Sequence, residues 1–419
     1  MSHSPLLLQL VVILCTARVL ALALRFIGQP AVIGEMIAGL MLGPMVLGAL
    51  APDFHAQLFA PDSLSALRGI SQIGLVLFMF IVGAELRMPT GLRSQMLASA
   101  WIGGCAMLLP FLFGLGMAPW LHPQLAPAGV GFVPFALFVA TAMAITAFPV
   151  LARILKDTGL AATPIGQLGL TSAAFADLLA WILLALVVAL VAAGSGWSGF
   201  ARMLFGLAAL AFVAFAIVRP ALAALLRRHA TDGKPDGMVL ASLLIVTFAF
   251  AALTQWLQLH EVFGAFLFGV CLPRDDKLLD TLVERLEYVA VLVLMPVFFA
   301  LAGLNTSADA FAGMGGVALL LILLLAIVGK VLGGAAGARL AGLGWRDAFA
   351  LGTLMNTRGL MELIVLKVGL DVGVIGQEIF TMLMLMAVVT TLMTSPLLQL
   401  LLRGRADRSD NSQHKVQSV

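Results

Sequence analysis

The sequence predicts an all-α protein that crosses a membrane about thirteen times. Of its 419 residues, 62% are hydrophobic and only 11% are charged, whereas soluble globular proteins have roughly 45–50% apolar and about 25% charged residues. The mean hydropathy is +1.09. At about 30–35 residues for each span with its loop, the length accommodates a dozen or so membrane helices. This composition excludes a soluble enzyme and a nucleic-acid-binding domain.

Thirteen apolar stretches are long enough to be spans, since a membrane helix needs about 20 apolar residues. Breaks rich in Gly, Pro and charged residues separate them. The ninth stretch is short, and we expect it to be tilted or partly re-entrant. The approximate ranges are 5–26, 30–50, 66–86, 94–118, 129–156, 164–192, 199–226, 237–258, 260–273, 280–303, 311–341, 346–370 and 375–402.

The distribution of Lys and Arg predicts the orientation. With the amino terminus outside, all but six of the 24 basic residues lie on inner flanks of the spans, as the positive-inside rule requires. We therefore expect a multi-pass protein of the cell inner (plasma) membrane with a cytoplasmic carboxyl terminus. The six exceptions are Arg18, Arg68, Arg202, Lys330, Arg358 and Lys367.

The chain is expected to form one transmembrane domain over residues 1–402. The polar segment 227–237 is the only sizeable inner loop and divides this domain near its middle. Residues 403–419 are polar and basic and too short for a domain, so we expect a short disordered cytoplasmic tail.

Two short motifs recur in the same order, which predicts an internal repeat. VIGEMIAGLMLGP (32–44) resembles VFGAFLFGVCLP (262–273), and FMFIVGAEL (78–86) resembles VFFALAGLN (297–305). Each pair lies seven spans apart, so the two copies, about 30–192 and 260–402, are expected to have opposite orientations. Inverted repeats are typical of secondary transporters, whose binding sites lie near the bilayer midplane at the repeat interface.

Two predicted spans at corresponding positions of the repeat contain helix-breaking and polar residues. The fifth contains ITAFPVLARIL (145–155), with Pro149 near Thr146 and Arg153, and the twelfth contains NTRGLMEL (356–363), with Gly359 among polar residues. Paired interrupted helices are the best indication in a sequence of a transporter's binding site.

Ionisable residues inside predicted spans are the main candidates for the site, because a charge there costs several kcal/mol unless it faces a cavity or a partner. Asp177 is the outstanding one, deep in the sixth span, and Lys330 lies well inside the eleventh. Arg358 and Glu362 are four residues apart on one helix face and can pair with each other. A purely structural pair explains them as well as a transport role does.

We predict that Asp177 binds either a proton or a monovalent cation. Thr146 and Ser172 are predicted to add hydroxyl oxygens to this ion- and proton-binding site, although such residues also commonly serve packing. Lys330, Arg358 and Glu362 are predicted to compensate charge in the core. No histidine lies in mid-span, so we expect no haem, no buried metal centre and no other cofactor.

With these residues located, the chain resembles the monovalent cation:proton antiporter-2 family, the sodium/hydrogen-exchanger-like transporters. The resemblance spans nearly the whole membrane region. It implies thirteen helices in two inverted repeats, a dimerisation domain, a core with two broken crossing helices, and a homodimer. The stretches that carry it are 29–44, 74–86, 145–160, 174–187, 329–334 and 355–375.

The chain departs from the family pattern at one position of the sixth span. Many electrogenic members have two adjacent acids there, and the first pairs with the lysine of the eleventh span. Here the first position is Ala176, and only Asp177 matches. The lysine is retained as Lys330, so its usual partner is missing. The departure favours exchange of one proton for one cation.

We therefore expect a secondary active transporter, not an enzyme, that exchanges Na⁺ or K⁺ for protons by alternating access. Two alternatives remain open: a sodium-coupled symporter of an organic anion on a related fold, and a channel-like or sensory membrane protein without obligatory exchange. The sequence has no HExxH or phosphate-binding GxxxxGK[ST] motif. The expected partners are the transported ions and the lipid bilayer, without nucleic acid.

Overall fold

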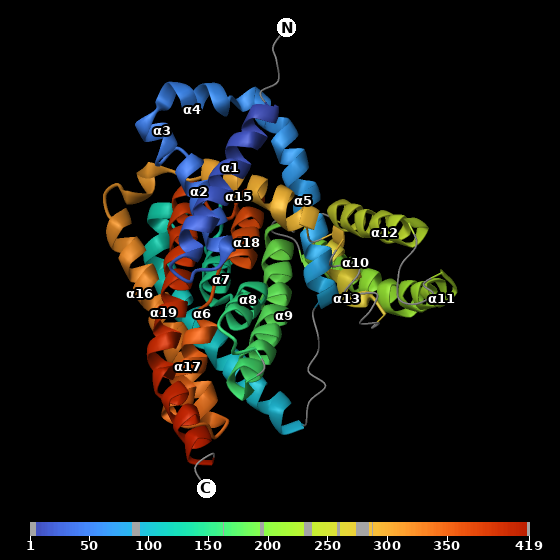
Figure 1. The fold of residues 1–419 in the computed structure, drawn as a ribbon. Coiled ribbons are helices and arrows are strands. Elements are labelled where there is room, and N and C mark those ends of the chain that lie inside the picture. Colours follow the sequence, from blue (N-terminus) through green and yellow to red (C-terminus); the bar gives the residue numbers. More distant parts are fainter. Residues whose placement is uncertain are drawn as a thin grey trace. The chain divides into compact units, whose positions relative to one another are not determined.

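The structure is a computed structural model that describes residues 6–85, 93–161, 163–192, 197–229, 237–257, 260–273, 285–286 and 288–416. Throughout these residues the regular structure is helical, which confirms the predicted all-α class (Figure 1). The chain divides into two compact units. The first comprises Met1–Leu20, Glu35–Arg87 and Ala185–Ser307, and the second comprises Ala21–Gly34, Met88–Leu184 and Ala308–Val419.

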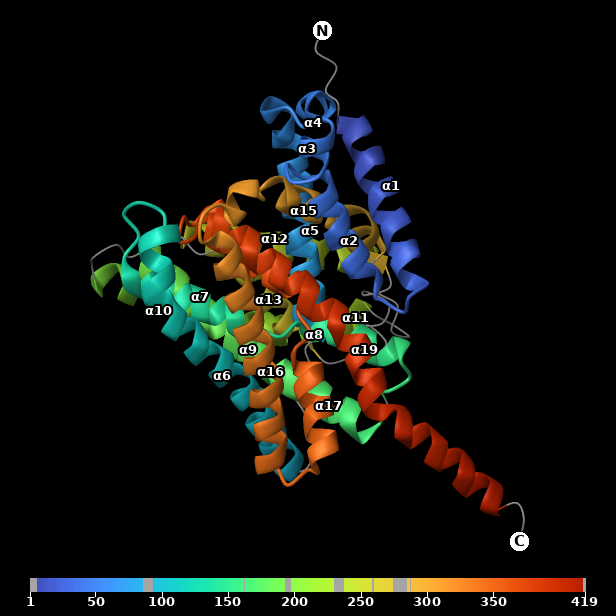
Figure 2. The ribbon, with the colours of Figure 1, turned by 90° about the vertical axis from the view of Figure 1, so that its left-hand side faces the viewer.

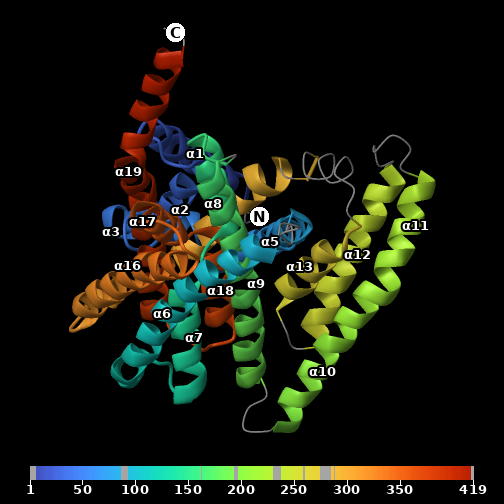
Figure 3. The same ribbon diagram turned by 90° about the horizontal axis from the view of Figure 1, so that it is seen from below.

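The first unit contains the helices of the amino-terminal quarter and of the middle of the chain, and α1 and α2 reach across its boundary. In Figure 3, α12 lies between α11 and α13. Two π-helical segments, η2 and η4, interrupt the helices of this unit. Its elements are α1 (Leu6–Arg25), α2 (Ala31–Leu42), α3 (Leu47–Leu50), α4 (Pro52–Leu58), η1 (Pro61–Ser63), α5 (Leu64–Glu85), α10 (Trp197–Val213), η2 (Ala214–Val218), α11 (Arg219–His229), α12 (Gly237–Trp256), α13 (Glu261–Cys271), η4 (Ala290–Leu294) and α15 (Met295–Leu304).

The second unit contains both interrupted helices. The long helix α16 packs along α6 and beside α17, and α19 passes both α16 and α17 (Figure 2). Its elements are α6 (Arg93–Leu125), α7 (Phe132–Ala144), α8 (Phe148–Asp157), most of α9 (Pro164–Ala192), η5 (Ala308–Phe311), α16 (Gly315–Leu340), α17 (Trp345–Met355), α18 (Leu360–Asp371) and α19 (Gln377–Val416).

The number of spans stays a prediction. In the described residues nine helices are long and apolar enough to cross a membrane, or ten if α17 and α18, bent by 44° at their break, form one span. Three shorter apolar helices, Phe132–Ala144, Glu261–Cys271 and Ala290–Leu304, lie where the fifth, ninth and tenth spans are predicted. The helix α13 is therefore short, as the sequence indicates for the ninth span.

The carboxyl-terminal helix extends beyond the predicted membrane region. The sequence predicts the last span to end near residue 402, whereas α19 continues to Val416. Residues 403–416 are thus helical in the structure, and a disordered tail in solution stays a prediction.

The glycines that the predicted repeat aligns lie at two close helix crossings in the first unit. The repeat aligns Gly39 with Gly269 and Gly83 with Gly303. A Cβ on Gly303 would lie 1.8 Å from the Gly39 carbonyl oxygen, and a Cβ on Gly269 would lie 2.9 Å from the Gly83 Cα. The glycines aligned by the repeat therefore lie at the α2–α15 crossing and at the α5–α13 crossing. The repeat itself and the inverted orientation of its copies stay predictions.

The substitution Gly303→Ala is expected to destabilise the protein. The added methyl group would displace the α2 backbone, and overpacking of this kind costs about 1–3 kcal/mol. Gly104→Ala in α6 is the matched control, since a Cβ there meets no atom within 4 Å. Thermal unfolding of the detergent-purified variants measures both. An unchanged melting temperature for Gly303→Ala would show that the α2–α15 contact is looser than the structure indicates.

Candidate functional site

Two helices are interrupted within apolar segments, and their breaks touch each other. The first break, residues 145–147, separates α7 from α8, and the second, residues 356–359, separates α17 from α18. The Ala147 N–H donates to the Thr357 carbonyl oxygen at 3.0 Å. The Thr146 hydroxyl donates to the Met355 carbonyl oxygen at 3.1 Å. The two predicted broken helices therefore cross at their breaks.

Local sequence explains each break. At the first, Ile145 is extended (φ −65°, ψ 142°), and Pro149 occupies the first turn of α8, where a missing N–H removes no helical hydrogen bond. At the second, Gly359 has φ 140° and ψ −125°, a conformation essentially reserved for glycine. Of the two residues that the sequence marks as helix breakers, Pro149 thus follows the first break and Gly359 lies in the second.

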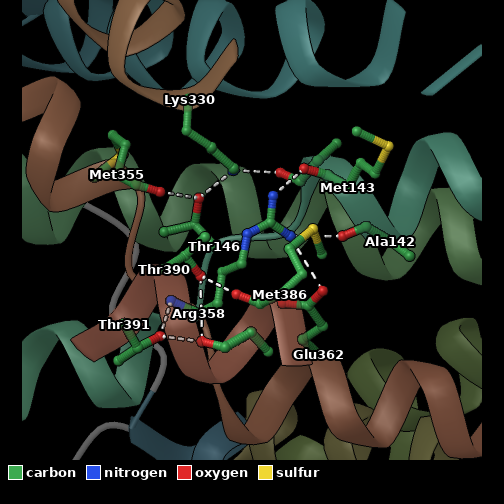
Figure 4. A network of polar contacts seen from close by, with 12 residues as sticks. Ala142, Met143, Thr146, Lys330, Met355, Arg358, Glu362, Met386, Thr390 and Thr391 are labelled. Carbon is green, nitrogen blue, oxygen red and sulfur yellow. Dashed lines mark hydrogen bonds and ion pairs between the residues drawn. The ribbon is translucent and has the colours of Figure 1, made fainter. Parts of the chain in front are cut away.

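Two cationic side chains cover the end of α7. The Arg358 guanidinium donates from Nη1 to the Ala142 carbonyl oxygen at 2.8 Å and from Nη2 to that of Met143 (Figure 4). Lys330 Nζ donates to the Ala144 carbonyl oxygen. A helix leaves its last carbonyls without partners and has a partial negative charge there. Arg358 and Lys330 satisfy these carbonyls and compensate that charge.

Lys330 contacts the first break and not a carboxylate. It is fully buried, and Nζ also donates to Thr146 Oγ1 at 2.6 Å. Because Thr146 donates in turn to the Met355 carbonyl, a hydrogen-bonded chain runs from α16 through the first break to the end of α17 (Figure 4). Within the described residues Lys330 forms no ion pair. Its ammonium is therefore held by neutral oxygen atoms.

Arg358 and Glu362 form the pair that their spacing permits. Nη1 and Oε1 are 3.2 Å apart, and both side chains are fully buried. Glu362 lies in the first turn of α18, where the partial positive charge of the helix favours a carboxylate. Arg358 Nε and Glu362 Oε2 have no hydrogen-bond partner among the described residues. The pair therefore retains hydrogen-bonding capacity on both members.

Asp177 lies in α9 and is buried, with 1% of its surface exposed. Neither carboxylate oxygen has a hydrogen-bond partner of normal geometry within the described residues. The polar group that approaches the carboxyl is the indole of Trp181, one turn further along α9. No described basic side chain forms a salt bridge with Asp177. A carboxyl buried in this way is poorly solvated. Its two oxygen atoms can bind an ion or a proton.

Ser172 is buried in the same helix but faces another direction. Its hydroxyl donates to the Leu168 carbonyl oxygen at 2.7 Å. Asp177 is five positions after Ser172, which places their side chains about 140° apart around the helix. The Ser172 backbone packs against α6, where a Cβ on Gly103 would lie 2.6 Å from its carbonyl oxygen. The structure thus does not bring the Ser172 hydroxyl to the face of Asp177.

The structure joins Thr146, Lys330, Arg358 and Glu362 in one network and places Asp177 and Ser172 outside its hydrogen bonds in the described residues. Sequence reasoning missed two further members. The Thr391 hydroxyl accepts from the Arg358 backbone N–H at 2.9 Å (Figure 4), and Asn356 Nδ2 donates to the Thr390 carbonyl oxygen at 3.4 Å. The available signals were the polar run before Arg358 and the hydroxyl-rich segment TTLMTS (390–395) within an apolar span.

Comparisons with known proteins agree on one family of membrane proteins. The family model described as sodium/hydrogen exchanger, transmembrane, matches residues 10–404. The Na⁺/H⁺ antiporter NhaS4 of Synechocystis sp. is 39% identical over 390 residues, which cover 93% of this chain and 95% of that protein. The solved structure of the sodium proton antiporter MjNhaP1 from Methanocaldococcus jannaschii at pH 8 matches with a TM-score of 0.61 over 93% of this chain and 97% of that chain. At 16% identity this likeness concerns the fold alone.

Longer relatives match the chain over part of their length. Cation/H⁺ antiporter 17 of Arabidopsis thaliana is 37% identical over 396 residues, 94% of this chain and 48% of that protein. K⁺/H⁺ antiporter 1 of Saccharomyces cerevisiae is 34% identical over 419 residues, 95% of this chain and 47% of that protein. The chain therefore spans about half the length of these plant and yeast relatives.

Proposed function

The chain belongs to the sodium/hydrogen exchanger transmembrane family, and from this premise we propose that it exchanges a monovalent cation for protons across the membrane. Both Na⁺ and K⁺ are candidates, because relatives are named as Na⁺/H⁺ and as K⁺/H⁺ antiporters. The observation that carries the proposal is the Asp177 carboxyl, buried without a basic partner among the described residues.

In this proposal Asp177 holds either a cation or a proton. A carboxylate that binds neither ion and has no basic partner is costly inside a membrane protein. The protein is therefore expected to change conformation only when Asp177 holds a cation or a proton. Loading by one ion excludes the other, since both neutralise the same group. Competition of this kind couples the two fluxes, and alternating access then needs only two conformations that open the site to opposite sides.

The remaining core charges keep a fixed balance in this scheme. Arg358 is hydrogen-bonded to the α7 carbonyls and paired with Glu362, and Lys330 is hydrogen-bonded at the first break. With all groups ionised, Lys330 and Arg358 balance Asp177 and Glu362. A proton and a monovalent cation on Asp177 add the same charge, so both loaded states have the same net charge.

Thr146 has a more structural role in this proposal than the sequence suggests. Its hydroxyl donates to Met355 and accepts from Lys330, which leaves one acceptor position on Oγ1. It links Lys330 to both breaks and offers at most one further contact to an ion. Ser172 donates within its own helix and, in our proposal, is a packing residue.

Homodimer formation, the plasma-membrane location and an outside amino terminus are further proposals. The orientation rests on the Lys and Arg distribution. Labelling of single cysteines introduced at residue 51 and at residue 342, on opposite predicted sides, with a membrane-impermeant reagent tests it. Preferential labelling of residue 342 in right-side-out vesicles would contradict the proposed orientation.

The decisive test of the exchange is a pH-jump fluorescence assay in proteoliposomes that compares Na⁺, K⁺ and Li⁺. We expect cation-dependent dissipation of the imposed pH gradient. The symporter alternative predicts sodium-dependent uptake of an organic anion, and the channel-like alternative predicts ion currents without coupled proton flux. Absence of cation-dependent proton movement from active liposomes would overturn the proposal.

Exchange is expected to be electroneutral. With Ala176 at the first position of the acidic pair, Asp177 is the single carrier in the sixth span, so one proton is exchanged for one cation. If each cycle moved one net charge across the membrane, a potential of 100 mV would change the free energy of transport by about 2.3 kcal/mol and would therefore change the rate. Na⁺/H⁺ exchange in liposomes with a valinomycin-clamped potential measures this bias, and we expect the rate to be independent of the imposed voltage.

The outcome that would contradict electroneutrality points to a particular residue. A voltage-dependent rate requires a second proton carrier, and Lys330 is the buried candidate without an acidic partner among the described residues. Lys330→Gln should then abolish the voltage dependence. If the wild-type rate is independent of voltage, Lys330→Gln is expected to impair exchange because the hydrogen bonds of Lys330 to the first break are lost. The stoichiometry should then stay the same.

A further inference from the structure

The two helix ends at the crossing are satisfied by different kinds of groups. At the end of α7, cationic side chains bind three successive carbonyls, those of residues 142, 143 and 144. At the end of α17, the groups that donate hydrogen bonds to the carbonyls are all neutral among the described contacts. The Thr146 hydroxyl binds the Met355 carbonyl, and the Ala147 N–H binds the Thr357 carbonyl. The partial negative charge of α17 is therefore left without direct cationic compensation among these residues.

Two side-chain oxygens at the same end of α17 lack partners. Asn356 and Thr357 are fully buried, and neither Asn356 Oδ1 nor Thr357 Oγ1 has a hydrogen-bond partner among the described residues. The Asn356 amide nitrogen donates to the Thr390 carbonyl, so the hydrogen bond to α19 uses the nitrogen and leaves the oxygen without a partner. Buried oxygens without partners are costly, and two in succession at a helix break indicate a ligand.

The two buried cationic side chains of the crossing, Lys330 and Arg358, contact groups other than Asn356 Oδ1 and Thr357 Oγ1. Lys330 is bonded to Ala144 and Thr146, and the Arg358 guanidinium is bonded to the α7 carbonyls and Glu362. Arg358 also has its charge offset by Glu362. Neither cationic group donates to Asn356 Oδ1 or Thr357 Oγ1, so these oxygens stay available for a different positive charge.

We propose that Asn356 Oδ1 and Thr357 Oγ1, together with the carboxyl-terminal end of α17, form an oxygen subsite for the transported monovalent cation. The inference rests on the proposed exchange and specifies which break receives the ion: the one in α17–α18, since the α7 end is already occupied by Arg358 and Lys330. Amide, hydroxyl and carbonyl oxygens replace the hydration shell of an alkali cation, and helix carboxyl-terminal ends coordinate such ions in transporters.

The test uses variants of similar size. Thr357→Val removes the hydroxyl, Asn356→Leu removes the amide oxygen together with the Nδ2 donor to the Thr390 carbonyl, and Thr357→Ser retains the hydroxyl. Thr247→Val in α12 is the matched control, because this buried threonine has its hydroxyl bonded to Leu243 within its own helix. In proteoliposomes, Thr357→Val and Asn356→Leu should each raise the apparent KM for Na⁺ or K⁺ by about ten-fold. Thr247→Val should match the wild type, and Thr357→Ser, which keeps a hydroxyl, should raise the KM less than Thr357→Val does.

An equilibrium measurement separates a cation site from a water site. Melting temperatures of the purified full-length protein are compared in NaCl, KCl and choline chloride at equal ionic strength. Cation-specific stabilisation should be lost in Asn356→Leu and Thr357→Val and retained in Thr357→Ser. If these variants melt at a lower temperature but keep the wild-type KM and the wild-type cation shift, ordered water fills the subsite and the proposal is overturned.

Failure of this inference is distinguishable from failure of the proposed function. A wild-type protein without cation-coupled proton flux would overturn the exchange itself. Cation-coupled flux that survives unchanged in Asn356→Leu and Thr357→Val, yet is lost in Asp177→Asn, would overturn the subsite alone.

Discussion

Asp177→Asn is expected to reduce cation-dependent proton exchange to the background of empty liposomes. Asn has the shape of Asp but cannot take up and release a proton in the physiological range, nor neutralise a bound cation. The carboxylate oxygens lack hydrogen-bond partners of normal geometry among the described residues, so the amide breaks no hydrogen bond seen there. The variant should therefore remain folded, which size-exclusion chromatography and thermal unfolding of the purified protein measure.

A second carboxylate on a helix of the same unit provides the control. Asp371 ends α18 and pairs with Lys367, and its side chain is 42% exposed. Asp371→Asn is the same chemical change at an exposed position, and we expect wild-type exchange. Cation-dependent proton flux retained by purified Asp177→Asn would remove Asp177 from the transport site.

Arg358→Met is expected to destabilise the protein by about 3–5 kcal/mol, the usual cost of leaving one member of a buried ion pair alone. The substitution leaves the Glu362 carboxylate without its ion-pair partner and removes the donors of the Ala142 and Met143 carbonyls. It therefore also weakens the contact between the two broken helices. Unfolding of the detergent-solubilised protein by heat or denaturant measures the loss.

A pair with the same sequence spacing serves as the control. Lys367 and Asp371 are four residues apart within α18, and their side chains are 28% and 42% exposed. Exposed pairs at this spacing contribute about 0.3–0.5 kcal/mol, so Lys367→Met should have little effect. A comparable loss in both variants would indicate that burial of the Arg358–Glu362 pair does not determine its importance.

The double variant Arg358→Met with Glu362→Gln separates the two contributions of Arg358. Removing the Glu362 charge should restore part of the stability, since no uncompensated carboxylate remains. The rest of the loss belongs to the Ala142 and Met143 carbonyls, because the Glu362→Gln change does not replace the donors that Arg358 supplied to them. Full restoration would mean that the carbonyl contacts contribute nothing measurable.

The sequence identified the buried ionisable residues of the second unit but not all their partners. Asp177, Lys330, Arg358 and Glu362 are conspicuous because each is an ionisable residue in an apolar segment. The Arg358–Glu362 pair was predicted from helix geometry, and it forms although Arg358 lies in the break before α18. The same geometry indicates that Ser172 lies on another face of α9 than Asp177. Asn356 and Thr391 were missed, because an uncharged amide or hydroxyl in an apolar span carries a weaker signal than an ionisable residue does.

The sequence by itself determined the properties that each segment has alone: membrane-spanning hydropathy, the short ninth segment, and the breaks at Pro149 and Gly359. These depend on local composition and backbone conformation. Only the tertiary structure decided that Arg358 binds carbonyls 215 and 216 residues earlier in the chain, and that Lys330 binds the first break rather than a carboxylate. Such partners depend on how the helices pack. A buried donor takes whichever acceptor the packing places within reach, because burying it unpaired costs free energy.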